Sequence, residues 1–449
     1  MVNFDLSTTQ QGLRSAVQSF ASSHLRNARS TYEEAGTQPN ADWSSRFRST
    51  QPIYRAAVEA GLLKAQIPQP LGGDGGSVLD TALVVEEMYA VETSASLTIL
   101  GTGLGLTPLI MAGSPKLQTR FLEPFLSGEG VPLGSLVFSE PAGSANYAEV
   151  GGDGFGTVAV EEGNEHVING EKIWATNSGG WDDRGADLQA LCCRVPLPGL
   201  SSREQVAIIL VTRTDISSNP PSAFQVLSHP RTVGHTAVDG PHIRYTNLRV
   251  PKSNLLVPPG EGTDVIDLTF TGSAVLVGAM SVGIMRQVFN TTLAWAKQEK
   301  RGSDEIMLKK QSVADLLIKI KIRCEAARAL VFKAACAFDK APSSAAAAEL
   351  CYEAKIFGSE SAVESVMDGI NLVGVSAYSR THSFGNLLQD AVVLPIFDGG
   401  NVGVRRRQLE KIFAMEGYDA WDATFGPAAK PMNGHAVKDI AGIPNGRSS

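Results

Sequence analysis

Residues 395–408 contain the side chains best suited to catalysis. In this segment a short turn with one acidic residue is followed by a basic run. The segment reads Pro-Ile-Phe-Asp-Gly-Gly-Asn-Val-Gly-Val-Arg-Arg-Arg-Gln, and its one acid is Asp398. Asn401 is expected to cap a following helix, so the Asp398 carboxylate would lie just before a helix N-terminus, whose dipole favours negative charge. Arg405, two turns further on, would approach the same place. The pattern allows a carboxylate base beside an arginine, although residue types alone favour a solvated turn.

Other catalytic signatures are missing from the sequence. It contains no P-loop, no GxGxxG after a strand, no HExxH and no GxSxG. The seven histidines are scattered and no pair has metal-ligand spacing, so we expect no metal. The five cysteines form no CxxC pair, which argues against both a zinc site and a disulfide framework and favours a reducing, cytoplasmic location.

The amino-acid composition excludes several classes of protein. The chain has 449 residues, 43% of them hydrophobic and 19% charged, so the bulk cannot be disordered, and about three domain-sized units are expected. A net charge of −7 without a long basic run argues against a nucleic-acid partner. Residues 93–115 and 268–285 are long enough to cross a bilayer, but they lack flanking aromatic belts or basic clusters. We therefore expect buried helices and no membrane partner.

The order of elements that must position the turn is helices, then strands, then helices. A capping-box pattern at Ser7 and Gln10 begins the first helix. Further helices are predicted over 53–60, 79–91, 96–111 and, less strongly because of a proline, 118–126. Short strands are predicted over 158–160, 166–168, 188–191 and 206–211, typical of an antiparallel barrel or sandwich. Helical spacing returns over 264–416, and glycines and prolines after 426 predict an extended or mobile tail.

Four motifs occur in order along the chain. They are AGLL followed by IP and GG over 60–73, FSEPAGS over 138–144, NGEKIWATN over 169–177, and LRVP with NLL over 248–256. Together they resemble the acyl-CoA dehydrogenase superfamily, and more closely its nitroalkane oxidase branch, nearly end to end. The resemblance implies an α+β fold with an N-terminal helical domain (1–130), a middle β-barrel domain (131–257), a C-terminal four-helix bundle (258–425) and a tail (426–449). It also implies FAD as cofactor and a homotetramer.

The resemblance assigns cofactor contacts by position. These fall on Leu136, Ser139, Ser144, Asn146, Trp174, Thr176, Arg301, Gln311, Asn371, Gly374, Gly399 and Gly400. The hydroxyls of Ser139 and Thr176 would meet the flavin ring, with Trp174 packed on it. Arg301 would reach the FAD phosphates of a neighbouring subunit. Without the resemblance, Leu136 and Trp174 would be core residues and Arg301 an exposed helix-end charge. Over 371–375 the chain lacks the second glycine of the family's QxxGG.

The same resemblance places Asp398 at the catalytic base, where acyl-CoA dehydrogenases commonly have glutamate. A nitro group acidifies its α-carbon more than a thioester does, so a carboxylate held ionised by a helix terminus and Arg405 would suffice. Ser273 would support this base. Without the resemblance, Ser273 would be interpreted as a small residue that packs between helices. The implied reaction converts a neutral nitroalkane into an aldehyde and nitrite, while O2 reoxidises the flavin and gives H2O2. The alternatives are dehydrogenation of an acyl thioester and a non-catalytic flavoprotein that keeps only the fold.

Overall fold

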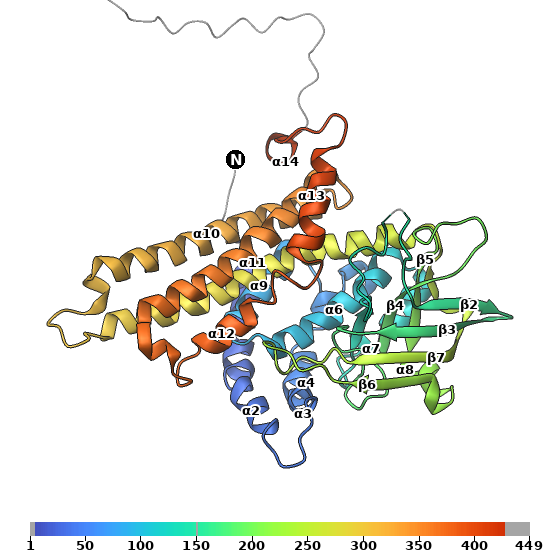
Figure 1. Ribbon diagram of the computed structural model, residues 1–449, viewed down its shortest axis with the longest axis horizontal. Coiled ribbons are helices and arrows are strands. Elements are labelled where there is room, and N and C mark those ends of the chain that lie inside the picture. The colour runs from blue at the N-terminus through green and yellow to red at the C-terminus, as the bar shows by residue number, and fades with distance from the viewer. Residues whose placement is uncertain (1–4, 150, 427–449) are drawn as a thin grey trace, which may run out of the picture.

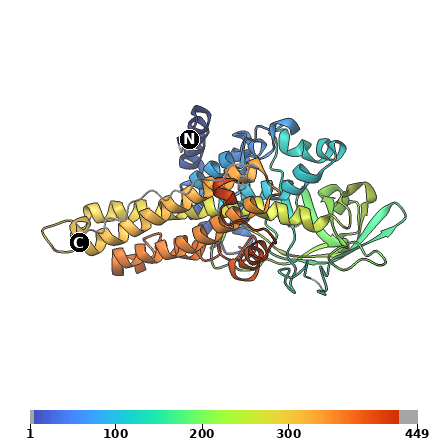
Figure 2. The ribbon, with the colours of Figure 1, turned by 90° about the horizontal axis from the view of Figure 1, so that it is seen from above.

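The computed structural model describes residues 5–149 and 151–426 (Figure 1). Helices of the N-terminal third lie between a β-sheet on one side and three long C-terminal helices on the other (Figures 1 and 2). The chain thus follows the order helices, strands, helices that the sequence predicts. The tail predicted over 426–449 lies outside the described residues except for Gly426.

Helices predominate in the N-terminal part of the described chain. They are α1 (Thr8–Phe20), the π-helical η1 (Ala21–Leu25), α2 (Ala28–Ala35), α3 (Ser45–Ser49), α4 (Gln51–Glu59), α5 (Val78–Tyr89), α6 (Ser94–Ala112) and α7 (Pro115–Leu126). The capping box is confirmed, because the Ser7 hydroxyl accepts from the Gln10 amide and the Gln10 side chain accepts from the Ser7 amide. Helix α7 continues through Pro124, so the predicted helix over 118–126 is complete.

The middle of the chain forms one eight-stranded sheet. Its strands are β1 (Gly134–Val137), β2 (Val158–Glu162), β3 (Glu165–Lys172), β4 (Leu188–Arg194), β5 (Val206–Thr212), β6 (Phe224–Ser228), β7 (His242–Pro251) and β8 (Leu255–Val257), with α8 (Arg213–Ser217) after β5. The order is β6-β7-β3-β2-β4-β5-β8, and β1 pairs with β4. Two corrections follow for this part of the chain. Strands β1 and β2 run parallel to β4, and the sheet is not closed into the expected barrel because the end strands β6 and β8 do not pair.

Three long helices dominate the C-terminal part: α9 (Gly262–Gln298), α10 (Gln311–Lys340) and α11 (Ala345–Val373). Helix α11 ends at Gly374, whose φ of 70° favours glycine. The short α12 (Phe384–Ala391) packs on α11 and α9, and α5 packs on α9 and α10. The predicted bundle is therefore completed by short and N-terminal helices; α13 (Arg406–Phe413) and α14 (Asp422–Phe425) follow.

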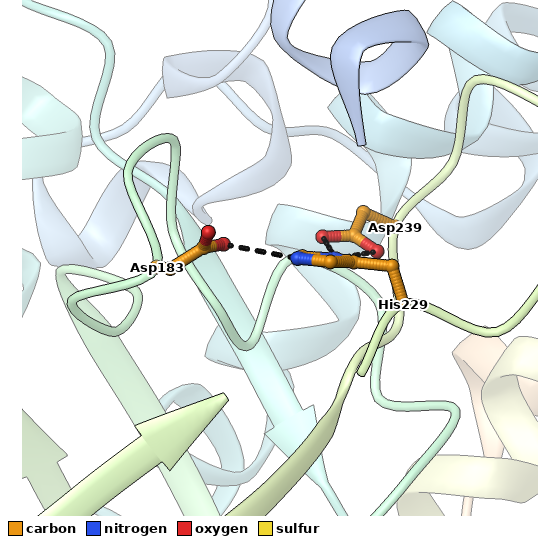
Figure 3. Close-up of side chains that lie close together, drawn as sticks. All are labelled: Asp183, His229 and Asp239. Atoms are coloured by element: carbon orange, nitrogen blue, oxygen red, sulfur yellow. Dashed lines mark hydrogen bonds and ion pairs between the residues drawn. The ribbon is translucent and has the colours of Figure 1, made fainter. Parts of the chain in front are cut away.

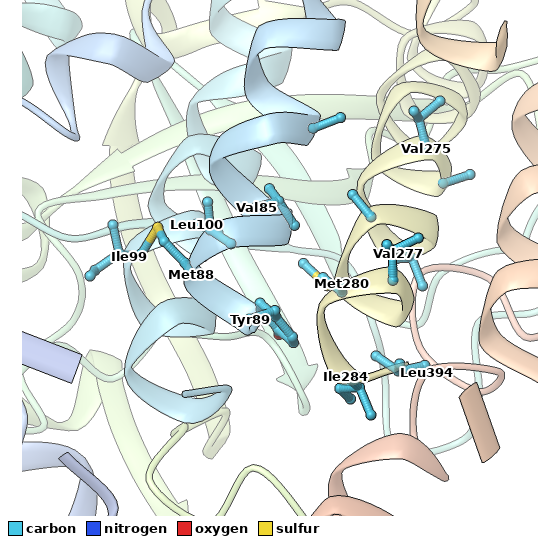
Figure 4. Packing of buried hydrophobic residues seen from close by; sticks show 14 of the residues in the cluster. Val85, Met88, Tyr89, Ile99, Leu100, Val275, Val277, Met280, Ile284 and Leu394 are labelled. Carbon is cyan, nitrogen blue, oxygen red and sulfur yellow. The ribbon is translucent and has the colours of Figure 1, made fainter. Parts of the chain in front are cut away.

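The contact between α5 and α9 fixes the helix that will carry part of the site. Val85 and Tyr89 of α5 face Met280 and Ile284 of α9 in one apolar cluster (Figure 4). A Cβ at Gly283 would lie 2.6 Å from the Cβ of Tyr89, so glycine permits the close approach. Helices α6 and α9 are long and apolar enough to cross a membrane, but most of each apolar window is buried inside the protein.

Candidate active site

Asp398 lies in a left-handed turn between α12 and a five-residue π-helical segment, η8 (Asn401–Arg405). Its φ is 51° and that of Gly399 is 76°. Burial raises the pKa of Asp398, while hydrogen bonding with the Ser273 side chain and the charges of Lys355 and Arg405 act against the rise. Burial is the largest cause, so the net direction of the shift is upward although Ser273, Lys355 and Arg405 favour the ionised carboxylate. The Ser273 hydroxyl also donates to the Phe270 carbonyl at 3.3 Å.

Arg405 holds the turn through its main chain. The fully buried guanidinium donates from Nη2 to the carbonyl oxygens of Asp398, at 2.5 Å, and Phe270, at 2.9 Å. Its Nη1 donates to Gln408 Oε1 at 2.8 Å, and the group lies 4.7 Å from the centre of the Tyr352 ring. Phe270 belongs to α9, so Arg405 ties the Asp398 turn to the helix that carries Ser273.

Glycine at position 399 favours this arrangement over any residue with a side chain. Its left-handed φ disfavours any side chain, and a Cβ there would lie 3.0 Å from both Cζ and Nε of Arg405. Gly400, with an ordinary φ of −54°, precedes η8 and accepts from the amides of Val404 and Arg405. The tight turn inferred at the two glycines is present, and its physical reason is the approach of the arginine.

Lys355 is part of the site and was missed by the sequence interpretation. It is fully buried on α11, and its Nζ donates to Asn401 Oδ1 at 3.0 Å and, more weakly, to the Leu394 carbonyl at 3.4 Å. Asn401 is therefore not the predicted helix cap; its amide donates to Ser359 and Glu360 of α11 instead. The only signal in the sequence was a lysine four residues from Cys351 and Ser359, on the buried face of a helix.

Two of the sequence motifs are held together by a buried ion pair. Lys172 of NGEK lies 2.9 Å from Glu140 of FSEP, and its Nζ also donates to the Phe138 carbonyl at 2.9 Å. Burial alone would raise the pKa of Glu140, but the Lys172 ammonium lowers it. The Phe138 ring contacts the Phe270 ring edge-on, with 5.0 Å between centres, so the segment that contains Ser139 is packed against α9.

An exposed aromatic residue follows in the NGEKIWATN segment. The side chain of Trp174 is 56% exposed, although its main chain is held in a left-handed conformation with φ of 65°. The Trp174 amide donates to the Gly240 carbonyl at 3.2 Å, and the Thr176 carbonyl accepts from Ser135 at 2.7 Å. An exposed indole on a fixed main chain suits stacking on a planar ligand. Leu136 is buried in β1 beside this segment.

The residues around Trp174 fit a flavin. In the described chain, the half-buried hydroxyls of Ser139 and Thr176 have no protein hydrogen-bond partner, so they are available to a polar ring edge. Ser144 is less free, because its hydroxyl accepts from the Glu140 amide at 2.9 Å. Asn146 accepts from Arg407 of α13 at 2.8 Å, an arginine that the sequence interpretation did not single out.

Four of the predicted cofactor residues lie elsewhere. Arg301, Gln311, Asn371 and Gly374 are exposed at the end of the long helices that is remote from the sheet (Figure 1). Arg301 donates to the Val373 carbonyl at 2.8 Å and to Ser376 at 2.9 Å. A single chain therefore brings this group together at one end of the bundle, but not to Asp398.

His229 lies between the carboxylates of Asp183 and Asp239 (Figure 3). His229 Nδ1 lies 3.0 Å from both carboxylate oxygens of Asp239, and Nε2 lies 3.5 Å from Asp183. Hydrogen bonds to Asp183 and Asp239 raise the pKa of His229 to about 10. These three residues are close enough to share a metal ion, but both ring nitrogens already face carboxylates, which suits a cationic imidazolium. The Asp239 carbonyl in turn accepts from the Asn177 amide at 2.8 Å.

Known proteins resemble this chain along nearly its whole length. Residues 7–129 match the acyl-CoA dehydrogenase N-terminal domain, and residues 260–412 match the acyl-CoA dehydrogenase C-terminal domain. Nitroalkane oxidase of Podospora anserina is 52% identical over 95% of this chain and 99% of its own length. Nitroalkane oxidase of Fusarium oxysporum is 44% identical over 95% of this chain and 98% of its own length.

Solved structures agree with these matches. The Podospora anserina nitroalkane oxidase structure has a TM-score of 0.91, covering 95% of this chain and all of that one. A nitroalkane oxidase active-site mutant crystallised with 1-nitrooctane, 44% identical with the same coverage, also has a TM-score of 0.91. Butyryl-CoA dehydrogenase from Megasphaera elsdenii, 21% identical with a TM-score of 0.78 over 92% of this chain and all of its own, shares the fold.

Proposed function

Because this chain belongs to the acyl-CoA dehydrogenase family and is a flavin-dependent oxidoreductase, we propose that it oxidises neutral nitroalkanes. The balanced reaction consumes a primary nitroalkane, O2 and water, and gives an aldehyde, nitrous acid and H2O2. The observation that carries the proposal is the carboxyl of Asp398, which interacts with Ser273, Lys355 and Arg405. Similarity to nitroalkane oxidases at 44–52% identity supports the choice of substrate.

Asp398 would remove the α-proton of the nitroalkane. Burial makes its carboxylate a stronger base than an exposed aspartate, while Ser273, Lys355 and Arg405 favour the ionised form that can accept a proton. Arg405 fixes the position of the turn through the Asp398 carbonyl, and Ser273 orients the carboxylate. A base held in a fixed position would spend little energy on reorganisation at the moment of transfer.

We propose FAD as the cofactor. When bound, it supplies the electron sink for the deprotonated substrate and the route by which electrons pass to O2. Trp174 would pack on the ring, and the hydroxyls of Ser139 and Thr176 would hydrogen-bond to its polar edge. The exposed group around Arg301 would serve the FAD of a neighbouring subunit in a homotetramer, since it lies at the end of the long helices that is remote from the sheet.

The proposal is tested by offering the purified flavoprotein nitroethane or butyryl-CoA under air. Nitrite release that matches O2 uptake with nitroethane is the expected result. The alternative, dehydrogenation of an acyl thioester, would bleach the flavin with butyryl-CoA and give no nitrite with nitroethane, and that outcome would overturn the proposal.

A further inference from the structure

We propose that Lys355 is a positioning residue for proton abstraction, binding both ends of the turn that carries Asp398 and placing a positive charge behind its carboxylate. The inference rests on the proposed function, because it concerns the base of that reaction. It adds a residue from α11 to a site otherwise built from α9 and the segment that follows α12.

Among the described residues, the side chain of Lys355 makes hydrogen bonds only to the two ends of the turn. Its Nζ donates to Asn401 Oδ1 at 3.0 Å, just after the turn, and to the Leu394 carbonyl at 3.4 Å, just before it. Asn401 is fixed independently, since its Nδ2 donates to Ser359 and Glu360 one turn further along α11. Displacing the lysine would therefore free the Leu394 end of the turn and remove one of the three contacts that hold the Asn401 side chain, while leaving α11 itself intact.

The charge of Lys355 has no ion-pair partner in direct contact within the described chain. The charged groups that face it are Asp398 from the turn, Arg405 from η8 and Glu360 from its own helix. Burial and the nearby Arg405 lower the pKa of Lys355 to about 7, whereas Asp398 and Glu360 act in the opposite direction. The two titrations are linked: an ionised Asp398 favours a protonated Lys355, and the protonated lysine favours the ionised base.

A purely structural lysine would have different consequences. If Lys355 only anchored the fold, its removal would disturb flavin binding and every substrate alike. If it acts through Asp398, its removal should harm only the step that needs a base. The nitronate anion prepared beforehand from nitroethane has already lost its α-proton, so its oxidation bypasses that step.

The experiment compares the wild type with Lys355→Met, using nitroethane and its preformed nitronate as substrates. We expect kcat/KM for nitroethane to fall about tenfold or more, and its acid limb to move to higher pH, because the base loses a stabilising cation. The nitronate value should stay within about twofold, since the base is not used. Lys355→Arg should recover part of the nitroethane activity. Lys319→Met, the same change on an exposed face of α10, should behave as the wild type.

Equal losses on both substrates, or an unshifted pH profile in Lys355→Met, would overturn the inference. Flavin content and thermal unfolding report whether each variant is folded; should Lys355→Met fail to fold, Lys355→Gln removes the charge while keeping a donor for Asn401, and the same comparison applies. The wild type separates the two proposals. A wild type that releases no nitrite from nitroethane refutes the proposed function, whereas an active wild type with an insensitive Lys355→Met refutes only the role of the lysine.

Discussion

The guanidinium of Arg405 is hydrogen-bonded to the main-chain carbonyl of Asp398, at 2.5 Å, and not to its carboxylate. The arginine therefore fixes where the turn lies without covering the oxygens that would accept a proton. The same nitrogen donates to the Phe270 carbonyl oxygen, so the planar guanidinium of Arg405 fixes the position of the turn relative to helix α9. The carboxylate stays free to interact with Ser273 from that helix.

Arg405→Lys should lower activity with nitroethane, because a lysine cannot form the same fork of hydrogen bonds. Losing one hydrogen bond to a charged group costs roughly 1.5–3 kcal/mol, so kcat should fall roughly tenfold or more. Steady-state nitrite release measures it. Arg55→Lys, on an exposed face of α4, is the matched control and should leave kcat unchanged. Full activity in Arg405→Lys would show that the turn does not need the fork.

Gly399→Ala should destabilise the folded protein. A left-handed alanine costs about 1–2 kcal/mol, and its Cβ would also press on Arg405 from 3.0 Å. Thermal unfolding should show a lower Tm together with weaker nitroethane activity. Gly403→Ala is the matched control, because a Cβ there meets nothing within 4 Å and the backbone is not left-handed. If both variants unfold at the wild-type temperature, the steric argument at Gly399 is wrong.

Asp398→Asn should abolish most nitroethane oxidation while sparing the preformed nitronate. A general base contributes roughly 10²–10⁴-fold, and that is the loss expected in kcat/KM. In the wild type, kcat/KM for nitroethane should fall as the pH decreases through the raised pKa of Asp398, since the protonated carboxyl cannot act as a base. An Asp398→Asn protein with wild-type activity would remove the proposed base.

The raised pKa of Asp398 also predicts a pH-dependent effect on stability. Folding disfavours the ionised form, so the stability present at low pH is lost as the pH rises past the unfolded-chain value of about 3.9 and through the raised folded pKa. Asp398→Asn should therefore have a higher Tm than the wild type at pH 8. Near pH 4 the difference should be smaller. A difference that grows toward acid pH would contradict the direction of the shift.

His229→Asn should destabilise the protein in a pH-dependent way. The pKa of His229 is raised to about 10, so its stabilisation is complete below the unfolded value of about 6.5 and is lost as the pH rises through 10. The Tm difference from the wild type should thus be larger at pH 7 than at pH 10.5. His24→Asn, an exposed histidine, is the control. A constant difference would show that His229 acts through packing and not through charge.

Much of the fold was predictable because its signals are local. The capping box at Ser7, the left-handed end of α4 at Gly61 and the apolar strands of the sheet depend on neighbours a few residues away. The open sheet and the short helices after α11 were not predictable in this way. Strand pairing and the path of the chain after Gly374 depend on contacts between segments far apart in the sequence.

The candidate site divides along the same line. The sequence by itself determined the family motifs and a turn at Asp398 and Gly399, since turn chemistry is written in adjacent residues. Only the tertiary structure decided what surrounds that turn. Lys355 reaches Leu394 and Asn401, which are 39 and 46 residues away along the chain. The tertiary structure also decided the direction of the Asp398 pKa shift, because desolvation depends on which distant segments pack over the carboxylate. The spacing of nearby residues does not reveal which segments these are.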